Sequence, residues 1–425
     1  MENRLFTKNF TLLAAGQASS LFGNCILDFA LSMYVLEVTG SAAVFAGFLA
    51  AAMIPTILLA PLGGVLADRA NRRNIMVMLD LLAGIVILAA ALLVDKGNNL
   101  IIIGAALIIM SILGAFESPT VQACVPQMQR GDNIIRGNAV INQIAAVSAL
   151  VGPFAGSMLY TVFGLKPVMY AGGFCFLITA LFECFIRLEF SPMETKDNIF
   201  TIIKNDLADS ICFIGKKEKV ILKLLLLVTI TAFFIQGTAL VGLPHMIRNV
   251  LGLGANYYGA AESVLGFAGI LGSVLAGLIV SRFRISRLNL LILCMGIFLF
   301  PAGLVFFIPA GISWRYAVTL AAFAMIQIAA SIFSVFGLSV IQQLIPQNMT
   351  GKIMAFAASF TLCAQPLGQI IYGVLFDRLS GAVYLILVPT GIVICIIGIC
   401  TKLFFKKVES RLEENQDTFL SEIRV

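Results

Sequence analysis

Long apolar segments, each close to 20 residues, recur along this chain and are separated by short stretches that hold most of the charges. About 20 consecutive apolar residues are what a helix needs to cross the hydrocarbon core of a bilayer. The composition agrees, because 60% of the 425 residues are hydrophobic and only 12% are charged, whereas a typical soluble domain has about 25% charged residues. The sequence therefore predicts an integral membrane protein built from α-helices.

Charges, Gly/Pro clusters and run lengths divide the chain into twelve predicted spanning helices. Their expected limits are roughly 10–36, 42–67, 74–94, 99–124, 137–163, 167–188, 220–246, 255–280, 288–308, 314–343, 352–377 and 382–405. These spans form two bundles of six helices, residues 1–188 and 220–405, joined by a charged central loop at 189–219 and followed by a charged tail at 406–425. The predicted fold class is an all-α membrane protein with two pseudo-symmetric six-helix bundles.

The two halves repeat several residues at one constant offset. Gly64 corresponds to Gly277, Arg69 to Arg282 and Pro153 to Pro366, whereas Asp68 corresponds to Ser281. Six helices per copy give both copies the same orientation in the membrane, which is the parallel-repeat architecture of many secondary transporters. The acid of the first copy is therefore lost in the second.

Lys and Arg are distributed unevenly between the two sides that twelve spans create. Of the 28 basic residues, those on the side opposite the termini are Lys96, Lys166, Arg248, Arg315 and Arg378. All eight tyrosines and Trp314 fall at the helix ends on that same side. By the positive-inside rule, we expect a multi-pass protein of the bacterial inner (cytoplasmic) membrane with both termini in the cytoplasm.

Polar side chains form a stripe along the first predicted helix. Gln17, Ser20, Asn24, Asp28 and Ser32 follow one another at intervals of three or four residues, so they share one helix face. Similar stripes occur in the predicted helices at 99–124, 220–246 and 314–343, which are the first members of the other three-helix units. This recurrence predicts a polar central cavity, although the same residues could serve as hydrogen-bonding contacts between helices. The candidates to line a substrate cavity are Gln17, Asn24, Ser32, Gln122, Gln236, Gln327, Ser331, Gln365 and Gln369.

Three carboxyl groups lie well inside predicted spans, at Asp28, Glu117 and Glu262. An acid within a membrane is neutral, paired or functional, and desolvation favours its protonated form. We expect these three residues to be proton-coupling sites; recognition of a cationic substrate and a structural hydrogen bond are the alternatives. Asp80 and Glu183 lie nearer the ends of their helices, where an interfacial position is expected.

The fifth predicted helix carries small residues on one face, with Gly152, Pro153 and Gly156 among them. Small residues allow close approach of a neighbouring helix, and the proline bends its own helix. Pro366 occupies the matching position in the eleventh helix. We expect both helices to rock during transport.

Features of enzymes and of metal or cofactor sites are not predicted. The sequence has no G-x-x-x-x-G-K-[ST] nucleotide-binding pattern, its nine cysteines lack metal-ligand spacing, and its lone His245 falls near an outer helix end. The net charge of +6 is attributed to membrane orientation and not to nucleic-acid binding. The predicted partners are a small-molecule substrate, protons and membrane lipid, with no catalytic residues, metal or cofactor and with the protein as a monomer.

The segment Gly64-Val65-Leu66-Ala67-Asp68-Arg69-Ala70-Asn71-Arg72-Arg73 resembles the signature loop of the major facilitator superfamily, G-x-x-x-D-R-x-x-R-R. The resemblance implies that Asp68 and Arg69 latch the cytoplasmic side when the carrier faces outward. The conformational-switch residues that it implies are Gly64, Asp68, Arg69, Arg72 and Arg73.

Two shorter segments resemble particular branches of this family. Gly152-Pro153-Phe154-Ala155-Gly156 is similar to the G-P-x-x-G-G motif of proton-driven drug exporters, with Ser157 in place of the last glycine. Thr39-Gly40-Ser41, Asn71 and Asp80 resemble the bacterial macrolide-efflux and enterobactin-exporter branch.

These features together predict a secondary active transporter that exports an amphiphilic small molecule, such as a drug-like compound or siderophore, in exchange for protons. A lysophospholipid or lipid flippase, or an inward-directed carrier of the same fold, is the alternative within this class. A membrane sensor that does not transport is the alternative of another class.

Overall fold

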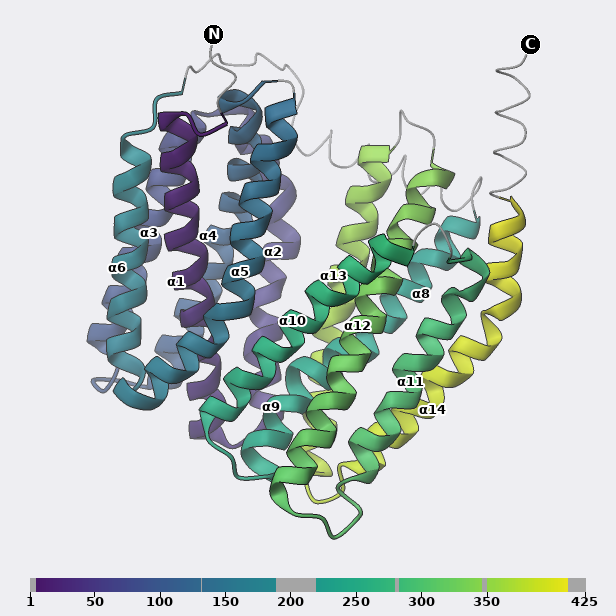
Figure 1. The fold of residues 1–425 in the computed structure, drawn as a ribbon. Helices are drawn as coiled ribbons and strands as arrows, with labels where there is room; N and C mark the ends of the chain where they lie inside the picture. Colours follow the sequence, from purple (N-terminus) through teal and green to yellow (C-terminus); the bar gives the residue numbers. More distant parts are fainter. Residues whose placement is uncertain (1–4, 131, 189–218, 280–282, 346–349, 412–425) are drawn as a thin grey trace, which may run out of the picture. The chain divides into compact units, whose positions relative to one another are not determined.

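The structure, a computed structural model, describes residues 5–130, 132–188, 219–279, 283–345 and 350–411. In these ranges the regular elements are helices, and twelve of them are long and apolar enough to cross a membrane (Figure 1). The prediction of an all-α protein with twelve spans is confirmed. The predicted loop at 189–218, Ser281 and Arg282, and the tail beyond Arg411 lie outside the described residues.

Six long helices make up the N-terminal half. They are α1 (Lys8–Thr39), α2 (Ala42–Arg69), α3 (Arg72–Leu93), α4 (Asn99–Met128), α5 (Asp132–Phe163) and α6 (Leu165–Cys184). Four of these helices, α1 to α4, have an N-cap residue whose side-chain oxygen accepts a hydrogen bond from a backbone N–H of the first turn. These N-cap residues are Thr7, Ser41, Asn71 and Asn98. Gly40 ends α1 in the left-handed region, with φ at 61°, which glycine adopts without steric cost.

The C-terminal half has shorter and more varied elements. They are α8 (Lys219–Gln236), η2 (Gly237–Gly242), α9 (Leu243–His245), η3 (Met246–Val250), α10 (Ala255–Ile279), η4 (Ile285–Arg287), α11 (Leu288–Leu304), α12 (Ile312–Leu344), α13 (Thr350–Arg378) and α14 (Tyr384–Cys400). The seventh span is thus a composite, because π-helical turns at η2 and η3 flank the short α9 that holds Pro244. Helical residues after α14 continue to Arg411, beyond the limit of 405 that hydropathy suggested.

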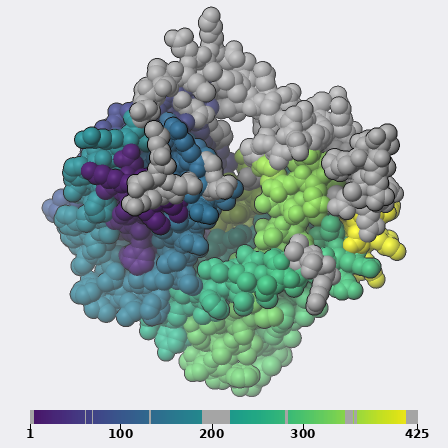
Figure 2. All heavy atoms as spheres, turned by 45° about the horizontal axis from the view of Figure 1, so that its top comes forward, coloured from purple at the N-terminus to yellow at the C-terminus, as the bar shows by residue number. Residues whose placement is uncertain are grey.

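The described chain divides into two compact units. The first comprises Met1–Ile203 together with Leu253–Ser263, and the second comprises Lys204–Gly252 and Val264–Val425. The first turns of α10 therefore belong with the N-terminal helices. Figure 2 shows the close packing of side chains within each unit, with the N-terminal helices in purple to blue and the C-terminal helices in green to yellow.

Within the first unit, α1 is the central packing element. It lies against α5 and α6, while α3 packs on α4 and α6, and α2 packs on α4. A large apolar core forms where α1, α3, α4 and α6 meet, with Leu27, Leu31, Ile87 and Phe176 among its buried members. In the second unit α11 packs against α12 and α14, and α13 packs against α8 and η2. This packing brings α3 and α4 close enough to the polar face of α1 to form side-chain hydrogen bonds with it.

Candidate functional site

The polar stripe of α1 passes through two different environments. Gln17 and Ser20 are buried, Asn24 and Ser32 are half-buried, and Asp28 is exposed. One part of the stripe is therefore packed inside the first unit, and the part around Asp28 is open. The acids of the unit gather around these two parts.

The buried part of the stripe contacts two carboxyl groups on neighbouring helices. The Ser20 hydroxyl lies 3.2 Å from Asp80 Oδ1 on α3 and 3.3 Å from Glu117 Oε1 on α4. Gln17 Nε2 donates to the same Glu117 oxygen at 3.5 Å. Because a hydroxyl has a single proton to donate, Ser20 can satisfy only one of the two acids at a time. Gln17, a candidate to line a substrate cavity, is thus placed against Glu117.

A third acid, Glu183 of α6, completes this group. Its carboxyl lies within hydrogen-bonding range of the Asp80 carboxyl. Asp80 and Glu183 each have 0% of their surface exposed, whereas Glu117 is half-buried. Asp80, Glu117 and Glu183 are called the inner carboxyl cluster below.

Asp80 and Glu183, for which an interfacial position is expected from the sequence, are both buried inside the first unit. Asp80 shares the buried face of α3 with Met76 and Ile87, and Glu183 shares the buried face of α6 with Phe176 and Thr179. Both acids are in register with the apolar stripe of their helix, so helix packing places them inside the unit. The spacing of each acid from the apolar residues of its helix could have predicted its burial. The sequence interpretation relied instead on the distance of each acid from the helix end.

The open part of the stripe faces one further acid, Glu262 of α10. Tyr258, in the first turns of α10, donates a 2.5 Å hydrogen bond from its hydroxyl to Glu262 Oε1 and stacks its ring on Phe29 with centroids 5.3 Å apart. Asp28, next to Phe29, lies within electrostatic range of Glu262. Two of the three predicted proton sites, Asp28 and Glu262, are therefore neighbours, while the third belongs to the inner carboxyl cluster.

Glycines of α5 allow the close approach that builds this second site. A Cβ on Gly156 would lie 3.1 Å from the Ile26 carbonyl oxygen and 3.3 Å from Phe29 Cβ. Gly152 faces Cys25 of α1 in the same way, and Gly259 of α10 lies against Ser157 and the Pro153 carbonyl oxygen. The small-residue face of α5 thus touches α1 on one side and the start of α10 on the other.

The remaining cavity candidates lie on several helices. Gln122 is exposed, Gln236, Gln327, Ser331 and Gln365 are half-buried, and Gln369 is buried. In the second unit Gln327 and Ser331 of α12 lie together opposite Gly269 of α10, where a Cβ would be 3.4 Å from Gln327 Nε2 and 3.7 Å from Ser331 Oγ. The structure therefore brings this pair together on one helix surface.

The signature loop between α2 and α3 is tied to two other helices. Arg72 donates to the Ala67 carbonyl at 2.7 Å and to the Ala123 carbonyl of α4 at 2.9 Å, and Arg73 donates to the Cys184 carbonyl at the end of α6. The side chain of Asp68 lies outside the described residues. The two described arginine contacts hold the α2–α3 turn against the ends of α4 and α6.

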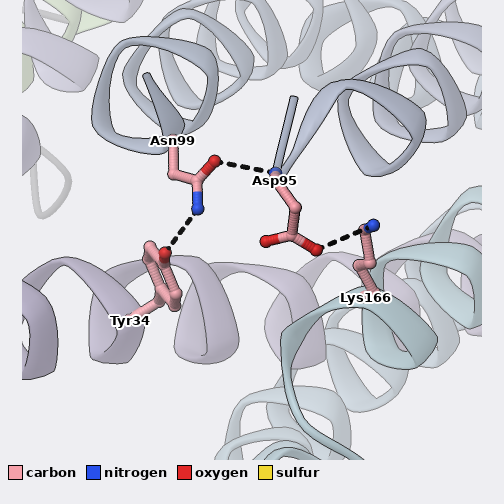
Figure 3. A network of polar contacts seen from close by, with 4 residues as sticks. All are labelled: Tyr34, Asp95, Asn99 and Lys166. Atoms are coloured by element: carbon pink, nitrogen blue, oxygen red, sulfur yellow. Dashed lines mark hydrogen bonds and ion pairs between the residues drawn. The ribbon is translucent and has the colours of Figure 1, made fainter. Parts of the chain in front are cut away.

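At the other end of the first unit, a polar network joins α1, the α3–α4 turn and α6 (Figure 3). Asp95 pairs with Lys166 at 2.8 Å, and its backbone N–H donates to Asn99 Oδ1 at 2.9 Å. Asn99 Nδ2 donates to the Tyr34 hydroxyl at 2.8 Å. The hydrogen bond from Lys166 holds the pKa of the Asp95 carboxyl below its ordinary value.

No group of three or more His, Cys, Asp or Glu side chains in the described ranges has an arrangement that could hold a metal ion. This statement includes the inner carboxyl cluster. Carboxyl groups can bind protons or cationic groups.

Comparisons with known proteins identify the family of this chain. Residues 13–369 match the sequence profile of the Major Facilitator Superfamily. Macrolide efflux protein A of Streptococcus pyogenes is 24% identical over 406 residues, which cover 92% of this chain and 95% of that protein. The multidrug efflux pump Tap of Mycolicibacterium fortuitum is 24% identical, with 87% and 88% coverage.

Solved structures show the same fold. A bacterial homologue of the iron transporter ferroportin, in an inward-facing state, superposes with a TM-score of 0.70 at 16% identity, covering 94% of this chain and 98% of that one. The family match extends from α1 into α13, and the resemblance to macrolide-efflux proteins found in the sequence is confirmed at modest identity. The chain is a multi-pass membrane protein that belongs to the major facilitator superfamily of transporters.

Proposed function

We propose that this protein exports an amphiphilic small molecule from the bacterial cytoplasm and that protons moving inward drive the export by alternating access. The observation that carries the proposal is the exposed carboxyl of Asp28, two-thirds of the way along a spanning helix and beside Glu262. A carboxyl at such depth is costly unless it serves a purpose. Access to water would let it gain and lose a proton.

The direction and the kind of substrate rest on the relatives. Two of them are named for efflux, one of macrolides and one of several drugs. Each unit by itself offers half-buried polar side chains among apolar ones, Asn24 and Ser32 on α1 of the first unit and Gln327 and Ser331 on α12 of the second. Such a mixed lining suits an amphiphile, because pockets for small molecules are mostly apolar with a few placed polar groups.

The positive-inside rule supports the accompanying orientation, with both termini in the cytoplasm and the protein in the inner membrane. We propose a monomer as the transporting unit, since the acids and the polar stripe of α1 find their partners within one chain.

The test is transport in everted membrane vesicles, with a panel of amphiphiles that begins with a macrolide, at two pH values and with or without a protonophore. We expect gradient-dependent accumulation by the natural protein and its loss in Asp28→Asn, because the amide cannot carry the proton. Asp95→Asn is the matched control, since it removes a carboxyl outside the spans.

Three results would contradict the proposal. Accumulation that survives the protonophore would exclude proton drive, and an Asp28→Asn variant at the natural rate would exclude Asp28 as the coupling residue. Movement of the panel compounds only in the inward direction would establish an importer in place of an exporter.

A further inference from the structure

The inner carboxyl cluster contains more buried acceptors than donors. Among the described residues, no group donates a hydrogen bond to Asp80 Oδ2 or to either Glu183 oxygen, and all three atoms are buried. The donors that reach the cluster are the Ser20 hydroxyl and the Gln17 amide, and they bond to Asp80 Oδ1 and Glu117 Oε1. Buried polar atoms in folded proteins nearly always have partners, so a donor is missing here.

A proton on the cluster supplies that missing donor. The Asp80 and Glu183 carboxyls lie within hydrogen-bonding range of each other, and two carboxyls can form a hydrogen bond only if one of them is protonated. Two adjacent carboxylates in a buried site also repel each other strongly, so such a pair behaves as one titrating unit that shares a proton. The burial of both carboxyls therefore favours at least one proton on the pair.

Basic residues lie toward the same end of the first unit as the inner carboxyl cluster. Arg72, at the start of α3, is close enough to Cys124 of α4 to interact with it electrostatically, and Glu183 is as well. The other described basic residues toward this end of the packed helices are Lys8, Arg69, Arg73, Arg130, Arg136 and Arg187. A cation close to a carboxyl favours its ionised form, whereas burial favours its protonated form.

Two features give the shared proton a way to exchange. Glu117 is half-buried, in contrast to Asp80 and Glu183, and the Ser20 hydroxyl lies between Glu117 and Asp80. Ser20 also lies on the same face of α1 as Asp28, about 12 Å along the helix axis at 1.5 Å per residue. The cluster therefore contacts the same face of α1 that carries Asp28.

We propose that Asp80, Glu117 and Glu183 form a second proton-binding site, distinct from Asp28 and Glu262, which holds one proton between Asp80 and Glu183 and releases it reversibly through Glu117. The proposal rests on the proposed proton coupling for its role in transport. The binding of the proton itself can be measured without transport.

The test is infrared difference spectroscopy of the purified full-length protein during pH cycles, following the carbonyl stretch that only protonated carboxyl groups show. Because Asp28 and Glu262 would add bands of their own, we expect one component of the carbonyl signal that is lost at alkaline pH and returns on acidification. The band should be absent in Asp80→Asn and in Glu183→Gln, and it should persist in the matched control Asp28→Asn.

Each other outcome overturns the proposal. A band that persists in both Asp80→Asn and Glu183→Gln places the proton elsewhere, and a band that does not respond to pH makes it a fixed structural proton. Both variants are neutral isosteres of the protonated acid, so failure of both to fold would show that the acids are needed as carboxylates. Absence of gradient-driven transport with the band behaving as expected would reject the proposed function and leave the proton site in place.

Discussion

At the scale of single residues, Asp95 combines an unusual backbone with a key side-chain contact. Its φ of 75° places it in the left-handed region, which Asn and Asp tolerate better than other residues with a Cβ. Its carboxyl reaches Lys166 of α6 and its N–H reaches Asn99 of α4. One residue thus fixes the turn between α3 and α4 and ties that turn to α6.

The ion pair should make stability depend on pH in a defined direction. The pKa of Asp95 is lowered by Lys166, so its stabilising effect is complete above the ordinary Asp pKa of about 3.9 and is lost as pH falls through the lower folded value. Asp95→Asn, which keeps the left-handed conformation, should unfold at a lower temperature than the natural protein near pH 6. The gap should be small, because the two side chains are 65% and 37% exposed, and it should close toward pH 2. Thermal unfolding in detergent across this range measures it.

Lys166→Met is the companion variant, because it removes the same pair from the other side. Its gap should close over the same pH range. A gap that stays constant with pH in both variants would show that the pair contributes nothing and that the Asn99 hydrogen bond alone fixes the turn.

At the scale of elements, the contact of α2 with α4 depends on one of two adjacent glycines. A Cβ on Gly63 would lie 3.0 Å from Phe116 Cα and closer still to the Ala115 carbonyl oxygen, whereas a Cβ on Gly64 would meet nothing within 4 Å. The glycine that this structure needs is therefore Gly63, although the family signature begins at Gly64.

These two glycines give a matched pair of variants. Gly63→Ala should lower the free energy of unfolding by about 1–3 kcal/mol, because the backbone of α4 has to move to accommodate the methyl group. Gly64→Ala should leave stability unchanged or raise it by up to about 1 kcal/mol, since alanine favours the helix. Thermal unfolding in detergent compares them, and equal effects would contradict the close contact of α2 and α4. Loss of transport by a fully stable Gly64→Ala would place the role of Gly64 in another conformation of the transport cycle.

At the scale of the whole molecule, the distribution of basic residues predicts which side of the membrane each loop faces. Lys96 is exposed in the α3–α4 turn, and Arg136 is exposed near the start of α5. With cytoplasmic termini, a membrane-impermeant maleimide added to intact cells should label Lys96→Cys above the background of the native cysteines and should not label Arg136→Cys. Both variants should react after the membrane is permeabilised. The reverse pattern would invert the proposed orientation.

Hydropathy was sufficient to predict the twelve spans, because each span is a predominantly apolar run and the bilayer fixes its length. The positions of Asp80 and Glu183 were not predicted, since the burial of an acid near a helix end depends on which helices pack around it. Gln17 shows the same limit, because its stripe position fits either a cavity or a hydrogen bond to Glu117. The grouping of Tyr258 and Glu262 with α1 was also beyond a single sequence, because it depends on contacts between helices that are far apart in the chain.

The π-helical turns of the seventh span have a consequence for the angular phase of its side chains. Each π turn closes hydrogen bonds five residues apart instead of four, so residues after η2 point in directions that an α-helical count does not give. Thr229 and Gln236 precede Gly237 and keep their common face, whereas His245 follows η2 and is out of phase with them. A helical wheel of residues 220–250 therefore misassigns the second part of the span, and the wheel has to be restarted after Gly242.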